Sequence, residues 1–93
     1  MAGKKFDEGK NRLDLVPPEF IEAVGWVLTF GAKKYGPDNW KEGIETDRIY
    51  GATMRHLMAW RRGEKTDSES GLSHLWHVAC NLAFLIYFEQ KGD

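Results

Sequence analysis

The strongest structural signal in the sequence is an apolar segment close to its C-terminal end. Ser73 can cap a helix there that runs to about Gln90. Its apolar side chains cover most of the helix circumference instead of a single stripe: Leu75, Val78, Ala79, Leu82, Leu85 and Ile86. A helix of this kind is buried on more than one side. We therefore expect it to pack against another chain as well as against its own.

Two further helices are expected upstream. The first covers about Pro17 to Tyr35, and Gly36 with Pro37 is a strong stop signal. The second starts after Thr46 or Asp47, either of which can cap it, and ends near Arg62. Their apolar faces are expected to hold Phe20, Val24, Val27, Leu28 and Gly31 in the first helix and Ile49, Ala52, His56, Leu57 and Trp60 in the second. No stretch alternates with a period of two. The expected fold is one all-α domain over residues 1–93, with three helices and a polar leader, residues 1–16.

Composition excludes several classes of function. The 13 Lys and Arg balance 14 Asp and Glu, so no charge excess indicates binding to nucleic-acid polymers or to a membrane surface. The longest apolar run is far shorter than the roughly 20 residues of a membrane span, and no secretory signal is expected. The single cysteine, Cys80, is expected to be inert core in a reducing, cytoplasmic compartment. A chain this short buries only about 60% of its unfolded surface, which favours a homo-oligomer.

The leader has the composition of a phosphate-binding segment. Lys5, Lys10 and Arg12 flank Gly9, which permits close backbone approach, and their side chains supply donors and positive charge. The spacing is not that of a P-loop. The alternative interpretation is a solvated charged tail.

Two carboxylates project from one side of the first expected helix. Glu19 and Glu22 are three residues apart, and such a pair can hold a divalent cation, which prefers oxygen ligands. Acidic residues are also common at helix N-termini, where they simply complement the helix dipole. Spacing alone leaves both interpretations open.

The end of the first helix and the loop behind it combine cations, rings and an amide. The residues are Lys33, Lys34, Tyr35, Asn39 and Trp40. Aromatic faces stack on bases and amides read their edges, so the set fits a base-recognition pocket. In the alternative interpretation the lysines complement the helix dipole, and Trp40 folds back onto the domain.

A polar stripe crosses the otherwise apolar third helix. His74, His77 and Asn81 lie on one face, and Asp67 and Glu69 precede them as natural partners. His56 on the second helix is more commonly a core histidine than a ligand. One outcome is a metal or phosphate site built from His56, Asp67, His74 and His77, and the other is a structural hydrogen-bond network.

These motifs together resemble a known family. They are Lys5-Phe6-Asp7, Gly9-Lys10, Arg12-Leu13-Asp14-Leu15, Pro17-Pro18-Glu19, the run Val27 to Gly36 with Asn39-Trp40, Arg55-His56-Leu57, Ala59-Trp60, Gly63-Glu64, Asp67, Glu69-Ser70-Gly71-Leu72, His74-Leu75, His77 and Cys80-Asn81. The chain resembles the phage and prophage family of dATP/dGTP diphosphohydrolase N-terminal domains. The resemblance implies a MazG-like all-α enzyme that oligomerises and cuts nucleoside triphosphates between the α and β phosphates, using divalent cations held by acidic residues. The MazG-like pattern has a Glu-x-x-Glu and a Glu-x-x-Asp pair. Glu19 and Glu22 match the first, whereas His74, His77 and Asn81 stand where the second would fall.

The resulting hypothesis is a phage-type purine deoxynucleoside triphosphate pyrophosphohydrolase. Its expected phosphate and base contacts are Lys5, Lys10, Arg12, Lys33, Lys34, Tyr35, Asn39, Trp40, Arg55 and His56. Mg²⁺ or Mn²⁺ is expected on Glu19, Glu22, Asp67 and Glu69, with Glu19, Glu22, His74 and His77 as the catalytic set. The alternative is a non-catalytic oligomer that sequesters a nucleotide signal, such as a cyclic nucleotide of antiviral defence. A purely structural oligomer would leave the leader and the Lys-Lys-Tyr-Gly segment without ligands.

Overall fold

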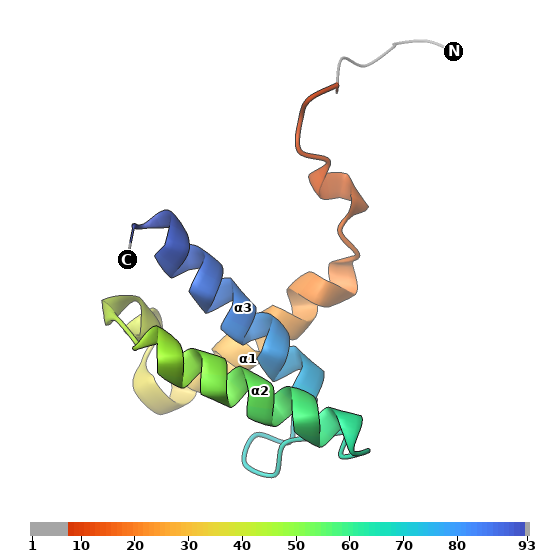
Figure 1. Ribbon diagram of the computed structural model, residues 1–93, viewed down its shortest axis with the longest axis vertical. Helices are drawn as coiled ribbons and strands as arrows, with labels where there is room; N and C mark the ends of the chain where they lie inside the picture. The colour runs from red at the N-terminus through yellow and green to blue at the C-terminus, as the bar shows by residue number, and fades with distance from the viewer. Residues whose placement is uncertain (1–7, 93) are drawn as a thin grey trace.

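A computed structural model describes residues 8–92, and over that range the fold is all-α, as predicted (Figure 1). The elements are the 3₁₀ turn η1 (Leu13–Leu15), helix α1 (Pro18–Tyr35), the 3₁₀ turn η2 (Asn39–Glu42), helix α2 (Thr46–Arg61) and helix α3 (His74–Gln90). Lys5, predicted to contact phosphate, lies outside the described residues.

Helix α3 is the centre of the fold, since both α1 and α2 pack against it (Figure 1). Ala79, Cys80 and Phe88 on α3 are buried, whereas Leu82 and Ile86, also expected to be covered, are exposed in this chain. Cys80 is completely covered, and burial raises the pKa of its thiol to about 11. The thiol therefore stays protonated at neutral pH and behaves as a small apolar side chain.

The helix ends follow from local backbone chemistry. Pro17 precedes α1, whose first turn needs no N–H from Pro18. Gly36 ends the helix with a φ of 93°, and its N–H donates to the carbonyl of Ala32 at 2.8 Å. The Ser73 hydroxyl caps α3 by accepting from the Leu75 N–H at 3.1 Å. These stop and cap signals were readable in the sequence.

The start and the buried face of α2 differ from expectation. The helix begins at Thr46 itself and has no side-chain cap, because Glu45 occupies the cap position. The buried face contains Thr53, whereas Trp60 is 42% exposed. Burial of Thr53 is possible because its hydroxyl donates to the Ile49 carbonyl at 2.7 Å, which satisfies the polar group inside the helix. Leu57, also expected in the core, is 36% exposed.

A large apolar surface is left uncovered by this chain. Exposed apolar side chains lie on every helix, among them Phe20, Ile21, Trp26, Tyr50, Met58, Trp60, Leu82 and Ile86.

No helix within residues 8–92 has the length and apolar character needed to cross a membrane.

Candidate functional site

A large cleft opens where the last turns of α1, the connection 36–45 and the middle of α3 meet. Its volume is about 1150 Å³, slightly larger than the usual range for small-molecule sites. The polar and aromatic side chains that line it are Thr29, Phe30, Lys34, Tyr35, Asp38, Asn39, Trp40, Lys41, Glu45, Arg48, Glu69, His77, Asn81 and Phe84. We refer to this hollow as the cleft.

The cleft unites several residues predicted from sequence to contact a nucleotide. Lys34 and Tyr35 come from the last turn of α1, and Asn39 and Trp40 come from η2. Asp38 adopts a left-handed conformation, with a φ of 61°, and turns the chain from α1 into η2. These four side chains therefore share one cavity although the helix ends between them.

Trp40 also has a structural role. Its ring centroid lies 4.6 Å from that of Phe84 and 4.8 Å from that of Tyr87. Both distances are typical of favourable aromatic pairs. The ring therefore anchors the connection 36–45 to α3, and Trp40 also contributes to the cleft wall.

The cleft contains charges of both signs. Lys34 forms an ion pair with Glu69, which raises the pKa of the Lys34 ammonium. Lys41 is 3.2 Å from the Asp38 carboxylate. Arg48 lines the cleft from the first turns of α2. Sequence reasoning missed Arg48 because it lies outside the motif at the end of α1.

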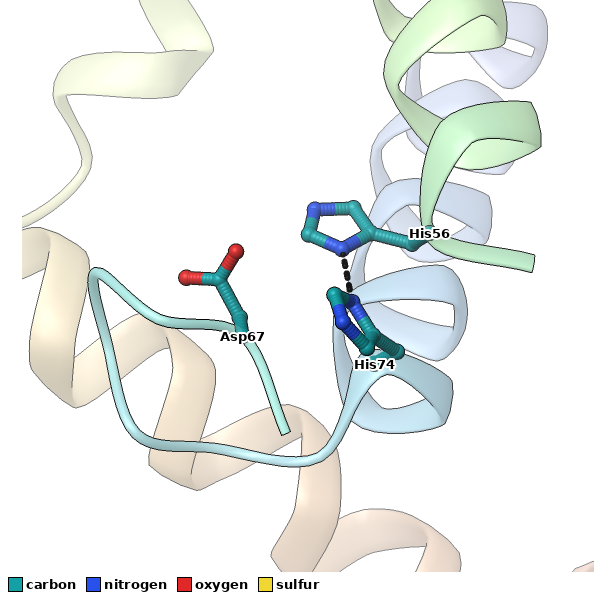
Figure 2. Close-up of side chains that lie close together, drawn as sticks. All are labelled: His56, Asp67 and His74. Atoms are coloured by element: carbon teal, nitrogen blue, oxygen red, sulfur yellow. Dashed lines mark hydrogen bonds between the residues drawn. The ribbon is translucent and has the colours of Figure 1, made fainter. Parts of the chain in front are cut away.

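A second cluster lies next to the cleft, where α2, the loop 63–73 and the start of α3 converge. His56, Asp67 and His74 each offer a ligand atom within 4.8 Å of the others (Figure 2). The Nδ1 atoms of the two histidines are 2.8 Å apart, and Asp67 lies beside both rings. We refer to these three residues as the His–Asp cluster. A site built from these residues together with His77 was one of the two outcomes that the sequence left open.

The loop 63–73 folds tightly and thereby brings Asp67 back to α3. The Asp67 N–H donates to the Leu72 carbonyl at 2.8 Å, and the Gly71 N–H donates to the Asp67 carbonyl at 2.8 Å. Gly71 has a φ of 74°, which favours glycine. The carboxylate is held by the Glu69 and Ser70 N–H groups, at 3.1 and 2.9 Å from Oδ2.

His77 connects the cluster to the cleft. Its ring stacks on that of His56, with centroids 4.5 Å apart and an interplanar angle of 6°. Its Nε2 is 2.7 Å from the Ser70 hydroxyl, and the side chain also lines the cleft. The cleft and the His–Asp cluster are therefore neighbours that share a histidine wall.

Burial sets the protonation of this region. It lowers the pKa of His56, with a further lowering from His77, and it also lowers the pKa of His77. Burial raises the pKa of Asp67, but the hydrogen bonds from Ser70 outweigh it and the net pKa lies below its ordinary value. At neutral pH both imidazoles are thus neutral and the carboxylate is ionised.

Other predicted site residues lie away from the cleft within one chain. Glu19 and Glu22 are exposed near the start of α1, whose 18 residues span about 26 Å. Arg12 forms an ion pair with Asp14 at 2.8 Å. Lys10, Lys33 and Arg55 are exposed and do not line the cleft.

Comparison with known proteins agrees with the motifs. The family model for dATP/dGTP diphosphohydrolase, N-terminal, matches residues 1–93. The chain belongs to this family. A curated relative, a dATP/dGTP diphosphohydrolase of Salmonella phage PMBT28, is 40% identical over 87 residues, which is 94% of this chain. The chain spans 30% of the length of that relative. No solved structure matches this chain.

Proposed function

We propose that this chain binds purine deoxynucleoside triphosphates in the cleft and takes part in their hydrolysis to a nucleoside monophosphate and pyrophosphate. The observation that carries the proposal is the convergence of Lys34, Tyr35 and Asn39 with Arg48 in one cavity. Family membership and the activity in the name of the phage relative, a dATP/dGTP diphosphohydrolase, agree with that chemistry.

The side chains of the cleft divide into a phosphate end and a base end. Lys34 and Arg48 supply positive charge for phosphate oxygens. Tyr35 and Asn39 offer a ring face and an amide for the base. In the free chain the Glu69 carboxylate forms an ion pair with the Lys34 ammonium, so an incoming phosphate would compete with Glu69 for that ammonium.

The proposal includes a divalent cation, Mg²⁺ or Mn²⁺. Such an ion would neutralise phosphate charge and lower the pKa of an attacking water. Of the four acids predicted to hold it, Glu69 lines the cleft and Asp67 lies directly behind it. Glu19 and Glu22 join no group of three metal-ligating side chains within residues 8–92. A single chain therefore supplies only part of the acid set.

We further propose that the working unit is a homo-oligomer. Exposed apolar side chains on all three helices, among them Trp26, Trp60 and Ile86, are consistent with a partner covering several helix faces. In such an assembly Glu19, Glu22 and the leader of one copy could approach the cleft of another. Lys10 and Arg12 retain their proposed phosphate role only through an arrangement of this kind.

One observation favours binding without turnover as a second candidate function. The cations and rings meet in one chain, whereas Glu19 and Glu22 lie apart from them. A protein that only sequesters a nucleotide, including a cyclic nucleotide signal, needs the cleft but not the acids. Nucleotide recovered intact after heat denaturation of the complex would support this second function.

The test is a product assay with dATP and dGTP in the presence of Mg²⁺ or Mn²⁺. The proposal expects pyrophosphate and monophosphate, with a large loss of activity in Lys34→Gln. Lys33→Gln is the matched control, because Lys33 is the adjacent lysine and does not line the cleft. Equal loss in both variants, or binding without any product, would contradict the hydrolytic proposal.

A further inference from the structure

We propose that His56, Asp67 and His74 form a binding site for one transition-metal ion of the Mn²⁺, Fe²⁺, Co²⁺ and Zn²⁺ class. This ion is distinct from a cation held by carboxylates alone. The inference goes beyond the proposed function, because it concerns an ion bound by the chain in the absence of any nucleotide.

The separation of the two imidazole nitrogens fits shared coordination. The Nδ1 atoms of His56 and His74 are 2.8 Å apart. Two nitrogen ligands about 2.05 Å from one ion lie about 2.9 Å apart at right angles and about 3.3 Å apart in a tetrahedral site. In the metal-free chain the two nitrogens share a hydrogen bond, and an ion bound between them would replace its proton with only a small separation of the rings. The Asp67 carboxylate oxygen is within 4.8 Å of both histidine nitrogens, so a small movement of this side chain would complete a three-ligand site.

The outer nitrogen of His74 supplies a second, independent observation. His74 is only 6% exposed, and its buried Nε2 has no hydrogen-bond partner. When Nδ1 is a metal ligand, Nε2 carries the proton and must donate it. Glu64 Oε1 is 3.9 Å away and is the acceptor that a small side-chain movement would reach. Metal-bound histidines commonly donate to a carboxylate in this manner.

Hydrogen bonds fix the side chain of Asp67, the proposed anionic ligand. Its Oδ2 accepts the Glu69 and Ser70 N–H groups, which fixes the carboxylate orientation. Both backbone N–H groups donate to Oδ2, which leaves the second oxygen, Oδ1, to face an ion. A fixed carboxylate with a free oxygen contributes charge without a large cost in side-chain entropy.

The ligand types select the class of ion. Imidazole nitrogen suits Mn²⁺, Fe²⁺, Co²⁺ and Zn²⁺, whereas Mg²⁺ prefers oxygen ligands and retains its water. Two histidines and one carboxylate leave coordination positions open for water or a phosphate oxygen. His77 is not assigned as a ligand, because its Nε2 is engaged with the Ser70 hydroxyl.

The test uses the metal alone. The full chain is freed of metal with a chelator and titrated with Co²⁺ and Zn²⁺, followed by visible absorption and by calorimetry. We expect one ion per chain, competition between Co²⁺ and Zn²⁺, and no displacement by a large excess of Mg²⁺. The thermal midpoint should rise with either transition metal and stay constant with Mg²⁺. No binding by wild type, or full displacement by Mg²⁺, overturns the proposal.

Variants separate ligation from folding. Asp67→Asn keeps an oxygen that can accept the two loop N–H groups but removes the charge, and His56→Asn changes a half-buried ligand. Each should weaken Co²⁺ binding by at least about tenfold while the circular dichroism spectrum is unchanged. His77→Gln is the matched control and should retain one ion per chain. Unchanged binding in Asp67→Asn and His56→Asn overturns the assignment.

Failure of this inference is distinguishable from failure of the proposed function. Metal binding without hydrolysis of dATP or dGTP would leave the ion site standing and reject turnover. Hydrolysis with Mg²⁺ by a chain that binds no Co²⁺ or Zn²⁺ would reject the ion site and leave the proposed hydrolysis standing.

Discussion

Replacing Trp40 with alanine tests whether this ring anchors the cleft wall. The ring contacts three aromatic side chains of α3, with centroids 4.6, 4.8 and 6.1 Å away, those of Phe84, Tyr87 and Phe88. At about 0.5–1.5 kcal/mol for each aromatic pair, truncation should cost about 1.5–4.5 kcal/mol. That is a large fraction of the roughly 5–15 kcal/mol by which small domains are stable.

The assay is urea unfolding followed by far-ultraviolet circular dichroism, at a fixed protein concentration because assembly contributes to stability. With a urea m-value of about 1–3 kcal/mol per molar, the midpoint for Trp40→Ala should fall by about 0.5 M or more. Trp40→Phe is the control that keeps an aromatic ring, and it should recover most of the loss.

Nucleotide affinity should fall together with stability in Trp40→Ala, because the connection 36–45 carries Asn39 as well. An unchanged unfolding midpoint with lost nucleotide binding would refute the anchoring role. That outcome would instead indicate that the ring acts mainly on the ligand, which was the base-holding role predicted from sequence.

The structure also predicts the direction of three further changes, in nucleotide affinity, in stability against pH and in assembly. In the presence of a metal chelator, Glu69→Gln should tighten nucleotide binding by about two- to fivefold, because it releases Lys34 from a partly exposed ion pair. Weaker binding of the variant in calorimetry would disprove the competition between Glu69 and phosphate for Lys34. The free energy of unfolding of the metal-free chain should be constant above pH 6.5 and decrease as the pH falls below that value. The reason is that the pKa values of His56 and His77 are lower in the folded chain than their ordinary 6.5, so the unfolded chain binds more protons. Urea midpoints that rise on acidification would contradict this direction. Ile86→Glu on the exposed face of α3 should shift the mass measured by light scattering toward a monomer, and an unaltered mass would exclude that face from the interface.

Much of the fold could be predicted because local signals agree with the tertiary structure. Gly36 and Ser73 determine helix ends through backbone geometry and a single hydrogen bond, which requires no knowledge of distant residues. The buried face of α2 could not be predicted as reliably. Thr53 is buried because its hydroxyl bonds to its own helix, whereas Trp60 stays 42% exposed despite its size and apolar character.

The candidate site was partly predictable for the same reason. Lys34, Tyr35, Asn39 and Trp40 are close in sequence, so a turn after α1 is enough to gather them. The meeting of His56 with Asp67 and His74 was one of two predicted outcomes for the polar stripe on α3.

Residues that depend on long-range geometry were harder to place. Arg48 reaches the cleft only because α2 begins beside it, and nothing in its local sequence indicates this. Glu19 lies at the opposite end of α1 from Lys34, a separation that follows from helix length and that the motif resemblance alone did not convey.

Amide chemical-shift mapping during a dGTP titration shows directly whether a nucleotide binds in the cleft beside the His–Asp cluster. Shifts should concentrate at Lys34, Asn39, Arg48 and Asn81 and saturate together. Shifts confined to the segment from Lys10 to Glu22, with the cleft residues unmoved, would contradict binding in the cleft.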